Sequence, residues 1–159
     1  MLPTSLFAGV NFRYAIQKCC EQIGWKIADL NENRALLRFE TGIGRAQNLF
    51  ILRYDSTLEF SAPSMTQFES GDQIPNHLST MLLRRNAENK IGFWCIETLD
   101  GKPTYTYMHN VDLSHINNEH FADVAQFLVR ECREVEEMVN KMNCVGRIAS
   151  PVMETERIR

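Results

Sequence analysis

The sequence lacks the long hydrophobic run that a membrane-spanning helix needs, and this absence sets a first limit on its function. No stretch of its 159 residues comes near the roughly 20 apolar residues in a row that cross a bilayer. Residues 1–7 also lack the charged start and the long apolar core of a signal peptide. We therefore expect a cytoplasmic protein with no membrane partner.

The sequence is also short of positive charge and of metal-binding spacings. Its 17 Lys and Arg residues against 20 Asp and Glu residues give a formal net charge of -3, whereas nucleic-acid binding usually needs a basic surface. The five cysteines form no CxxC pair, so we expect reduced thiols that serve as small apolar side chains. The sequence predicts no nucleic-acid partner, no metal and no cofactor.

No motif in the sequence indicates a catalytic site. A cysteine nucleophile would need a histidine nearby, but no local signature frames such a pair. Residues 42–44 read Gly-Ile-Gly and precede a strand-like run, so they lack the helix N-terminus with which glycine-rich loops hold phosphate. The sequence therefore predicts a protein that is not an enzyme.

What the sequence does contain is a clear order of helical and strand-like segments. Apolar residues at spacings of three and four after Asn11 predict a first helix, which Gly24 ends. Extended chain begins at residue 25, and strands are predicted at 34–40, 48–54 and 57–61. The last of these is either a separate strand or part of one long bulged strand. A long connection is expected over residues 62–73.

The second half of the chain has the same order with fewer strands. Pro75 suits the first turn of a helix, so a helix is predicted over 75–89. Residues 91–98 and 104–111 are predicted strands that meet at the Asp100-Gly101 turn. Apolar residues at helical spacing then predict a long amphipathic helix over 117–142.

Together these segments predict a single α+β domain. The order helix, three strands, helix, two strands, helix separates strands from helices, which favours a sheet covered by helices on one face or end. We expect a flexible leader at 1–10, the folded domain at 11–145 and a flexible tail at 146–159.

Two of the predicted strands are apolar on both faces. Helices on one side of a sheet cover one face only, and large exposed apolar patches are unusual on monomers. The second face is then covered by a partner chain, a second copy or a bound peptide, or else by the connection that carries Met65 and Phe68. The residues that we predict to form a partner or dimer surface are Leu49, Phe50, Leu52, Leu78, Trp94 and Ile96.

With its segments in this order, the chain resembles the type III secretion chaperone-like fold, and within it the YbjN-like and uncharacterised cyanobacterial branch. The resemblance covers about residues 10–143 and includes the segment Gly24-Trp25-Lys26-Ile27 after the first helix. It implies a curved antiparallel sheet with helices mainly on one face, often in a homodimer. Secretion chaperones of this fold bind extended segments of other proteins through apolar grooves and added strands. The resemblance supplies no catalytic residue.

Three hypotheses for function follow from these patterns. The first is a non-enzymatic homodimer that binds an extended protein segment, as a chaperone or regulator. The second is a small-molecule-binding domain or enzyme with a pocket on the concave face of the sheet, lined by Tyr105, Tyr107 and His109. The third is a scaffold within a larger complex. A dimer in solution, a co-purifying ligand and an obligate partner would distinguish the three.

Overall fold

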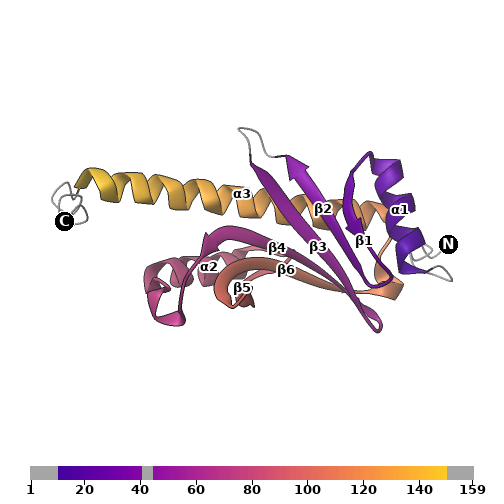
Figure 1. Ribbon diagram of the computed structural model, residues 1–159, viewed down its shortest axis with the longest axis horizontal. Helices are drawn as coiled ribbons and strands as arrows, with labels where there is room; N and C mark the ends of the chain where they lie inside the picture. The colour runs from indigo at the N-terminus through magenta and orange to yellow at the C-terminus, as the bar shows by residue number, and fades with distance from the viewer. Residues whose placement is uncertain (1–10, 41–44, 150–159) are drawn as a thin grey trace.

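The structure, a computed structural model, describes residues 11–40 and 45–149, with side chains as far as residue 143. The elements follow the order α-ββββ-α-ββ-α (Figure 1). The helices are α1 (Phe12–Ile23), α2 (Asn76–Glu88) and α3 (Asn118–Ala149). The strands are β1 (Ile27–Leu30), β2 (Arg34–Glu40), β3 (Ala46–Tyr54), β4 (Thr57–Gln67), β5 (Phe93–Leu99) and β6 (Lys102–Asp112). The predicted α+β class is confirmed.

All six strands form one antiparallel sheet in the order β1-β2-β3-β4-β6-β5. The first four strands follow one another as a meander. The chain then crosses through α2 to the far edge, where β5 begins, and β6 returns between β5 and β4. As a result β1 and β5 are the edge strands, and β4 and β6 lie inside the sheet.

Local signals in the sequence explain where α1 begins and ends. The Asn11 side chain accepts a hydrogen bond from the backbone N–H of Tyr14 at 2.8 Å, which caps the helix. Gly24 ends it with a φ of 82°, a left-handed conformation that glycine adopts without strain. The predicted apolar stripe is buried and consists of Phe12, Ala15, Ile16, Cys19 and Cys20.

The segment after residue 56 differs from its prediction in two ways. Residues 57–61 begin a separate strand, because Asp55 turns the chain with a φ of 48°. The long connection that we predicted at 62–73 is wrong in its first half, since β4 continues to Gln67. Pro63 is tolerated there because the β4–β6 pairing shifts register between Pro63 and Gln67. Pairing with β6 thus overrides the turn-like composition.

Two further boundaries differ from the predicted ones. Residues 27–30 form a strand of their own, β1, which pairs with β2 and adds a fourth strand before α2. Helix α3 runs on to Ala149, past the start of the tail that we predicted at residue 146. The predicted leader at 1–10 and the rest of that tail at 150–159 lie outside the described residues.

The helices pack on the sheet and build one core against it. Helix α3 packs against β4, β6 and β3 and extends past the strands at its C-terminal end (Figure 1). The rings of Phe60 on β4 and Phe121 on α3 lie 5.4 Å apart between their centres. The fully buried residues of α3 are Phe121, Val124, Ala125, Leu128 and Cys132. None of the helices in the described part of the chain is long and apolar enough to cross a membrane.

Candidate functional site on the open face of the sheet

The register of the strands places two different sets of side chains on the two faces of the sheet. Residues directly opposite each other in an antiparallel pair lie on the same face, and neighbours along a strand alternate. One set, with Phe60 and Tyr107, is buried against the helices. The other set forms what we call the open face: Phe50, Leu52, Glu59, Ser61, Pro63, Cys95, Glu97, Thr106 and Met108.

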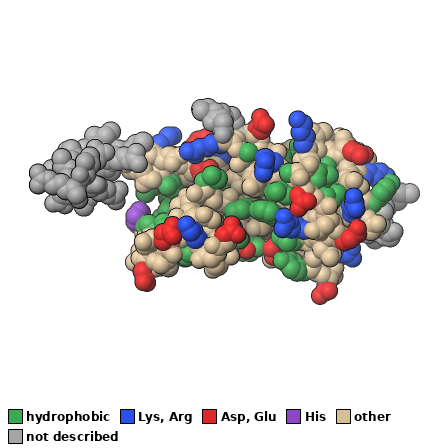
Figure 2. All heavy atoms as spheres, viewed as in Figure 1, with side chains coloured by type: hydrophobic (Ala, Val, Ile, Leu, Met, Phe, Trp, Pro, Cys, Tyr) green, Lys and Arg blue, Asp and Glu red, His purple; other side chains and the backbone are tan. Residues whose placement is uncertain are grey.

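The open face contains a cavity of about 640 Å³. Its lining is mixed, with apolar groups from β3 and β4 beside charged groups. The apolar lining residues include Phe50, Leu52, Tyr54, Pro63 and Met65, and the charged ones are Arg34, Glu59, Glu97 and Asp100. Tyr54 is 56% exposed and Met65 is 71% exposed, so apolar surface remains open to solvent at the rim. Figure 2 shows one face of the molecule, on which hydrophobic side chains reach the surface between charged ones.

Two carboxylates, Glu59 and Glu97, lie close together in this cavity. Burial of Glu59 and the nearby charge of Glu97 raise the pKa of the Glu59 carboxyl above its usual value. The hydroxyl of Ser61 donates to Glu97 Oε2 at 3.5 Å. Within the described ranges, neither carboxylate forms an ion pair with a Lys, Arg or His side chain. The cavity therefore holds negative charge that the described residues do not neutralise.

The open face also contains Thr106 and Cys95, which the strand register places in one row with Pro63 of the cavity lining. Thr106 is fully buried between Pro63 and Cys95, and its Oγ1 has no hydrogen-bond partner among the described residues. The Sγ of Cys95 lies 3.3 Å from the sulfur of Met108. Burial and the charges of Glu97 and Glu59 raise the pKa of the Cys95 thiol to about 11. At neutral pH this thiol is protonated, which makes it a poor nucleophile.

The six residues that we predicted for a partner surface separate into three groups. Leu49, Leu78 and Trp94 are at most 5% exposed and belong to the core, so in this fold they are not available to a partner. Phe50 and Leu52 are half-buried on the open face and line its cavity. Ile96 is 48% exposed on the edge strand β5. Which face of a two-faced apolar strand meets the helices depends on the strand register, and the sequence pattern did not settle this.

The residues of the second hypothesis do not line the cavity. Tyr105 and Tyr107 are buried on the helix side, where Tyr105 shares a hydrogen bond of 2.7 Å with Ser79 and Tyr107 donates to the carbonyl of Ile91. The Nδ1 of His109 accepts a hydrogen bond from the backbone N–H of Gly92 at 3.1 Å. These three residues therefore lie apart from the open-face cavity, because their strand turns them toward the helices. Tyr105 lines a separate pocket of about 150 Å³, and a small-molecule role stays a prediction.

The segment around Met65 and Phe68 does not cover the open face either. Met65 lies exposed at the cavity rim, and its backbone N–H donates to Glu136 of α3 at 2.8 Å. Phe68 turns away and packs edge-to-face on Tyr105, with 5.6 Å between the ring centres. Among the residues that the structure describes, this connection therefore leaves the cavity uncovered.

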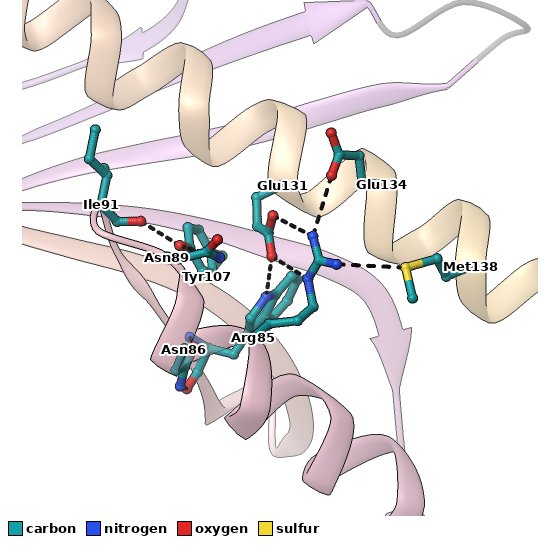
Figure 3. A network of polar contacts seen from close by, with 9 residues as sticks. Arg85, Asn86, Asn89, Ile91, Tyr107, Glu131, Glu134 and Met138 are labelled. Carbon is teal, nitrogen blue, oxygen red and sulfur yellow. Dashed lines mark hydrogen bonds and ion pairs between the residues drawn. The ribbon is translucent and has the colours of Figure 1, made fainter.

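A polar network behind the sheet ties α2 to α3 (Figure 3). Arg85 donates to both oxygens of Glu131, each at 2.7 Å, and Trp94 Nε1 donates to Glu131 Oε1 at 3.0 Å. Burial alone would raise the pKa of Glu131, but the hydrogen bonds from Arg85 and Trp94 outweigh it and the net shift is downward. The sequence patterns predicted no ion pair for Arg85 and did not single out Glu131. A charge within an apolar helical stripe was the available signal.

Helix α2 also covers part of the β5 edge through Asn86. Asn86 Oδ1 accepts from the backbone N–H of Trp94 at 2.6 Å, and Asn86 Nδ2 donates to the Trp94 carbonyl at 3.1 Å. Outward backbone groups alternate along an edge strand, so the next ones belong to Ile96 and Thr98. Among the described residues, none forms hydrogen bonds with the outward N–H and C=O groups of Ile96 and Thr98 as Asn86 does with those of Trp94. Exposed apolar side chains flank this edge: Leu83, Phe93 and Ile96.

Comparison with known proteins supports the fold but assigns no function. No known protein family matches the sequence, and no curated protein matches it. The structure is similar to that of YbjN from E. coli, which is described as a proposed transcription regulator. The TM-score is 0.53 at 18% sequence identity, over 79% of this chain and 86% of that chain. This likeness shows a YbjN-like fold, while the cyanobacterial branch stays a prediction.

Proposed function

We propose that this protein is a non-enzymatic binding module that holds an extended segment of a partner protein on the open face of its sheet. The observation that carries the proposal is the cavity of about 640 Å³, whose rim exposes Tyr54 and Met65 above the half-buried Phe50 and Leu52. Aromatic and flexible apolar side chains of this kind are common anchors at protein-binding surfaces. A partner segment would remove them from water.

The chemistry of the cavity supports binding in preference to catalysis. Cys95, which the strand register places on the open face, has a thiol pKa raised to about 11 and so lacks an activated nucleophile's character. The fold likeness to YbjN, itself described as a proposed transcription regulator, is compatible with regulation through protein contacts. The net charge of -3 disfavours direct contact with nucleic acid.

A binding screen with defined peptides tests the proposal. The full-length protein is applied to an array of 12-residue peptides that combine apolar and polar residues, and the affinities of the strongest binders are then measured by fluorescence anisotropy. We expect Leu52→Asp to weaken these peptides by at least about tenfold, because a charge replaces an anchor in the cavity. Tyr14→Asp is the matched control, since Tyr14 is 52% exposed on α1. Equal weakening by both variants, or no binder at all, would contradict the proposal.

We also propose that two copies pair through the β5 edge. This proposal is supported by the outward backbone groups of Ile96 and Thr98, which bond to no described residue, and by the exposed Leu83, Phe93 and Ile96 beside them. Unprotected edge strands readily pair with another chain. Light scattering after size-exclusion chromatography should report a dimer for the wild type and a monomer for Ile96→Lys. Tyr14→Lys should remain dimeric, and a monomeric wild type would refute the pairing.

A further inference from the structure

We infer that the open face selects a lysine or arginine side chain of the segment it binds, through the carboxylates of Glu59 and Glu97. This inference rests on the proposed function, because it names the chemistry of one residue in the bound segment. It is carried by three observations: negative charge in the cavity that no described residue pairs, a buried hydroxyl nearby without a described partner, and an apolar wall beside the carboxylates.

The first observation is the charge at the centre of the cavity. Glu59 lies on β4 and Glu97 on β5, yet both line the same cavity, and Ser61 between them donates to Glu97. Arg34 also lines the cavity, but its guanidinium is bound to Asp29 at 3.2 Å. Asp100 adds a further carboxylate to the lining. A half-buried carboxylate pair without a cation favours an occupant that brings positive charge.

The second observation is independent of charge. Thr106 is fully buried on the open face, in the row of side chains next to Ser61, and its Oγ1 has no hydrogen-bond partner among the described residues. A buried polar atom without a partner is uncommon and costs stability. The carboxylates are acceptors only, and the Thr106 hydroxyl beside the cavity lining still has an unused acceptor, so this part of the open face favours an occupant that brings hydrogen-bond donors. An ammonium group supplies three donors and a guanidinium five.

The third observation concerns the walls of the cavity. Phe50 and Leu52 lie half-buried on β3, across from Ser61 and Glu59 in the strand register. Lysine and arginine have long aliphatic stems that pack on apolar surface while the charged end reaches polar groups. The guanidinium of Arg34 already lies 5.6 Å from the centre of the Phe50 ring, so this wall accommodates a cation.

Other occupants fit these observations less well. A metal ion would need more ligands, and the described residues contain no group of three or more His, Cys, Asp or Glu side chains placed to hold one. An acidic segment would be repelled by Glu59 and Glu97. A purely apolar segment would bury both carboxylates without a partner, which costs more than it gains.

A small cation tests the site without any peptide. The full-length protein, labelled with ¹³C, is titrated with n-butylammonium chloride while the carboxyl resonances of Glu59 and Glu97 are followed by NMR. We expect a saturable shift at these two carboxyls and weaker binding, by about fivefold, in Glu59→Gln and in Glu97→Gln. Glu21→Gln removes the same charge from an exposed position on α1 and should bind as the wild type does. An equal response to n-butanol or to sodium chloride would overturn the inference.

A peptide series then identifies the source of the cation. The strongest binders from the array are remade with each Lys or Arg replaced in turn by norleucine, which keeps the stem and removes the charge. We expect one replacement to weaken binding about fivefold in the wild type and to have no effect in the Glu59→Gln, Glu97→Gln double variant. If peptides bind but no replacement matters, the inference fails and the proposed function stands. If n-butylammonium binds but no peptide does, the proposed function fails. The cation that the cavity binds then does not come from a protein segment.

Discussion

The two faces of this sheet are made from the same strands but differ in almost every physical respect. Against the helices, alternate residues such as Leu49, Phe60 and Tyr107 are fully buried and belong to one continuous apolar core. On the open face, their neighbours Phe50 and Glu59 are half-buried around a cavity whose two glutamates form no ion pair with a described residue. Among the described residues, the helix side is a continuous apolar core, whereas the open face contains carboxylates without an ion pair and a buried hydroxyl without a partner.

This difference indicates where stability and binding reside. Burial against α3 removes apolar area from water at about 25 cal/mol per Å², and the packing is filled by side chains of the same chain. The open face combines a raised pKa at Glu59 with a buried hydroxyl at Thr106 that has no partner in the described part of the chain. Such features lower the stability of an isolated chain, and they are common where a site is prepared for a ligand.

The largest expected contrast is between two leucines of β3. Leu49→Ala should lower the free energy of unfolding by about 3 kcal/mol, because it leaves a cavity in a fully buried core. Leu52→Ala, on the open face, should cost about 1 kcal/mol or less, since Leu52 already contacts solvent. Urea unfolding followed by circular dichroism measures both. Equal losses of unfolding free energy would contradict the contrast, because they would mean that the Leu52 side chain is as well covered as that of Leu49.

A second contrast concerns the ion pairs behind the sheet. Arg85→Ala should cost about 2 to 3 kcal/mol, because it leaves the carboxylate of Glu131, whose side chain is 5% exposed, without its guanidinium. Arg133→Ala breaks an exposed pair with Glu137 on the outer side of α3, where the separation is 4.0 Å, and should cost less than about 0.5 kcal/mol. The same urea experiment compares them. A loss at Arg133 as large as at Arg85 would contradict the importance of burial.

The sequence predicted the elements better than it predicted the surfaces. Helical spacing located α1 and α3, because an amphipathic stripe is a local property of the chain. The pattern of apolar residues on both faces of β3 and β5 did not show that Leu49 and Trp94 belong to the core and Phe50 to the open face. That choice depends on strand order and on which face the helices cover, both of which are set by contacts between residues far apart in sequence.

The candidate site was missed for a related reason. Glu59 and Glu97 are separated by α2 and lie on strands that are not neighbours, with β6 between them. Each looks like an ordinary solvent-facing residue of an alternating strand. The register of β4, β6 and β5 brings them into one cavity, and a single sequence contains no signal for that register.

A smaller effect of opposite sign is expected at Thr106. Thr106→Val replaces a buried hydroxyl that has no described partner with a methyl group of similar shape, so it should stabilise the protein by about 0.5 to 1 kcal/mol. Thr104→Val is the matched control on the same strand, because the Thr104 hydroxyl donates to the Lys102 carbonyl at 3.2 Å. Losing this hydrogen bond should lower the melting midpoint. Differential scanning calorimetry measures both midpoints. Destabilisation by Thr106→Val would indicate that the hydroxyl has a partner in solution.

The smallest expected effect depends on pH and comes from Glu59. The folded-state pKa of Glu59 lies above its unfolded value, so the folded state favours the protonated form. Its contribution to stability is complete below the unfolded pKa and is lost as the pH rises through the raised folded pKa. Glu59→Gln resembles the protonated side chain at every pH. The variant should therefore have a higher melting midpoint than the wild type at neutral pH, and the difference should shrink to nothing in acid.

The pKa of Glu131 is shifted in the opposite direction to that of Glu59, so Glu131 is a control from the other face of the sheet. The pKa of Glu131 is lowered, so its contribution is present above the unfolded pKa and is lost as the pH falls through the folded value. Melting midpoints of the wild type, Glu59→Gln and Glu131→Gln across pH 3 to about 7 cover the usual range of carboxyl titration. The Glu131→Gln variant should be less stable than the wild type at neutral pH. If Glu59→Gln behaves in the same direction as Glu131→Gln, then Glu59 has a cationic partner within the chain, and the two faces of the sheet are more alike than their geometry indicates.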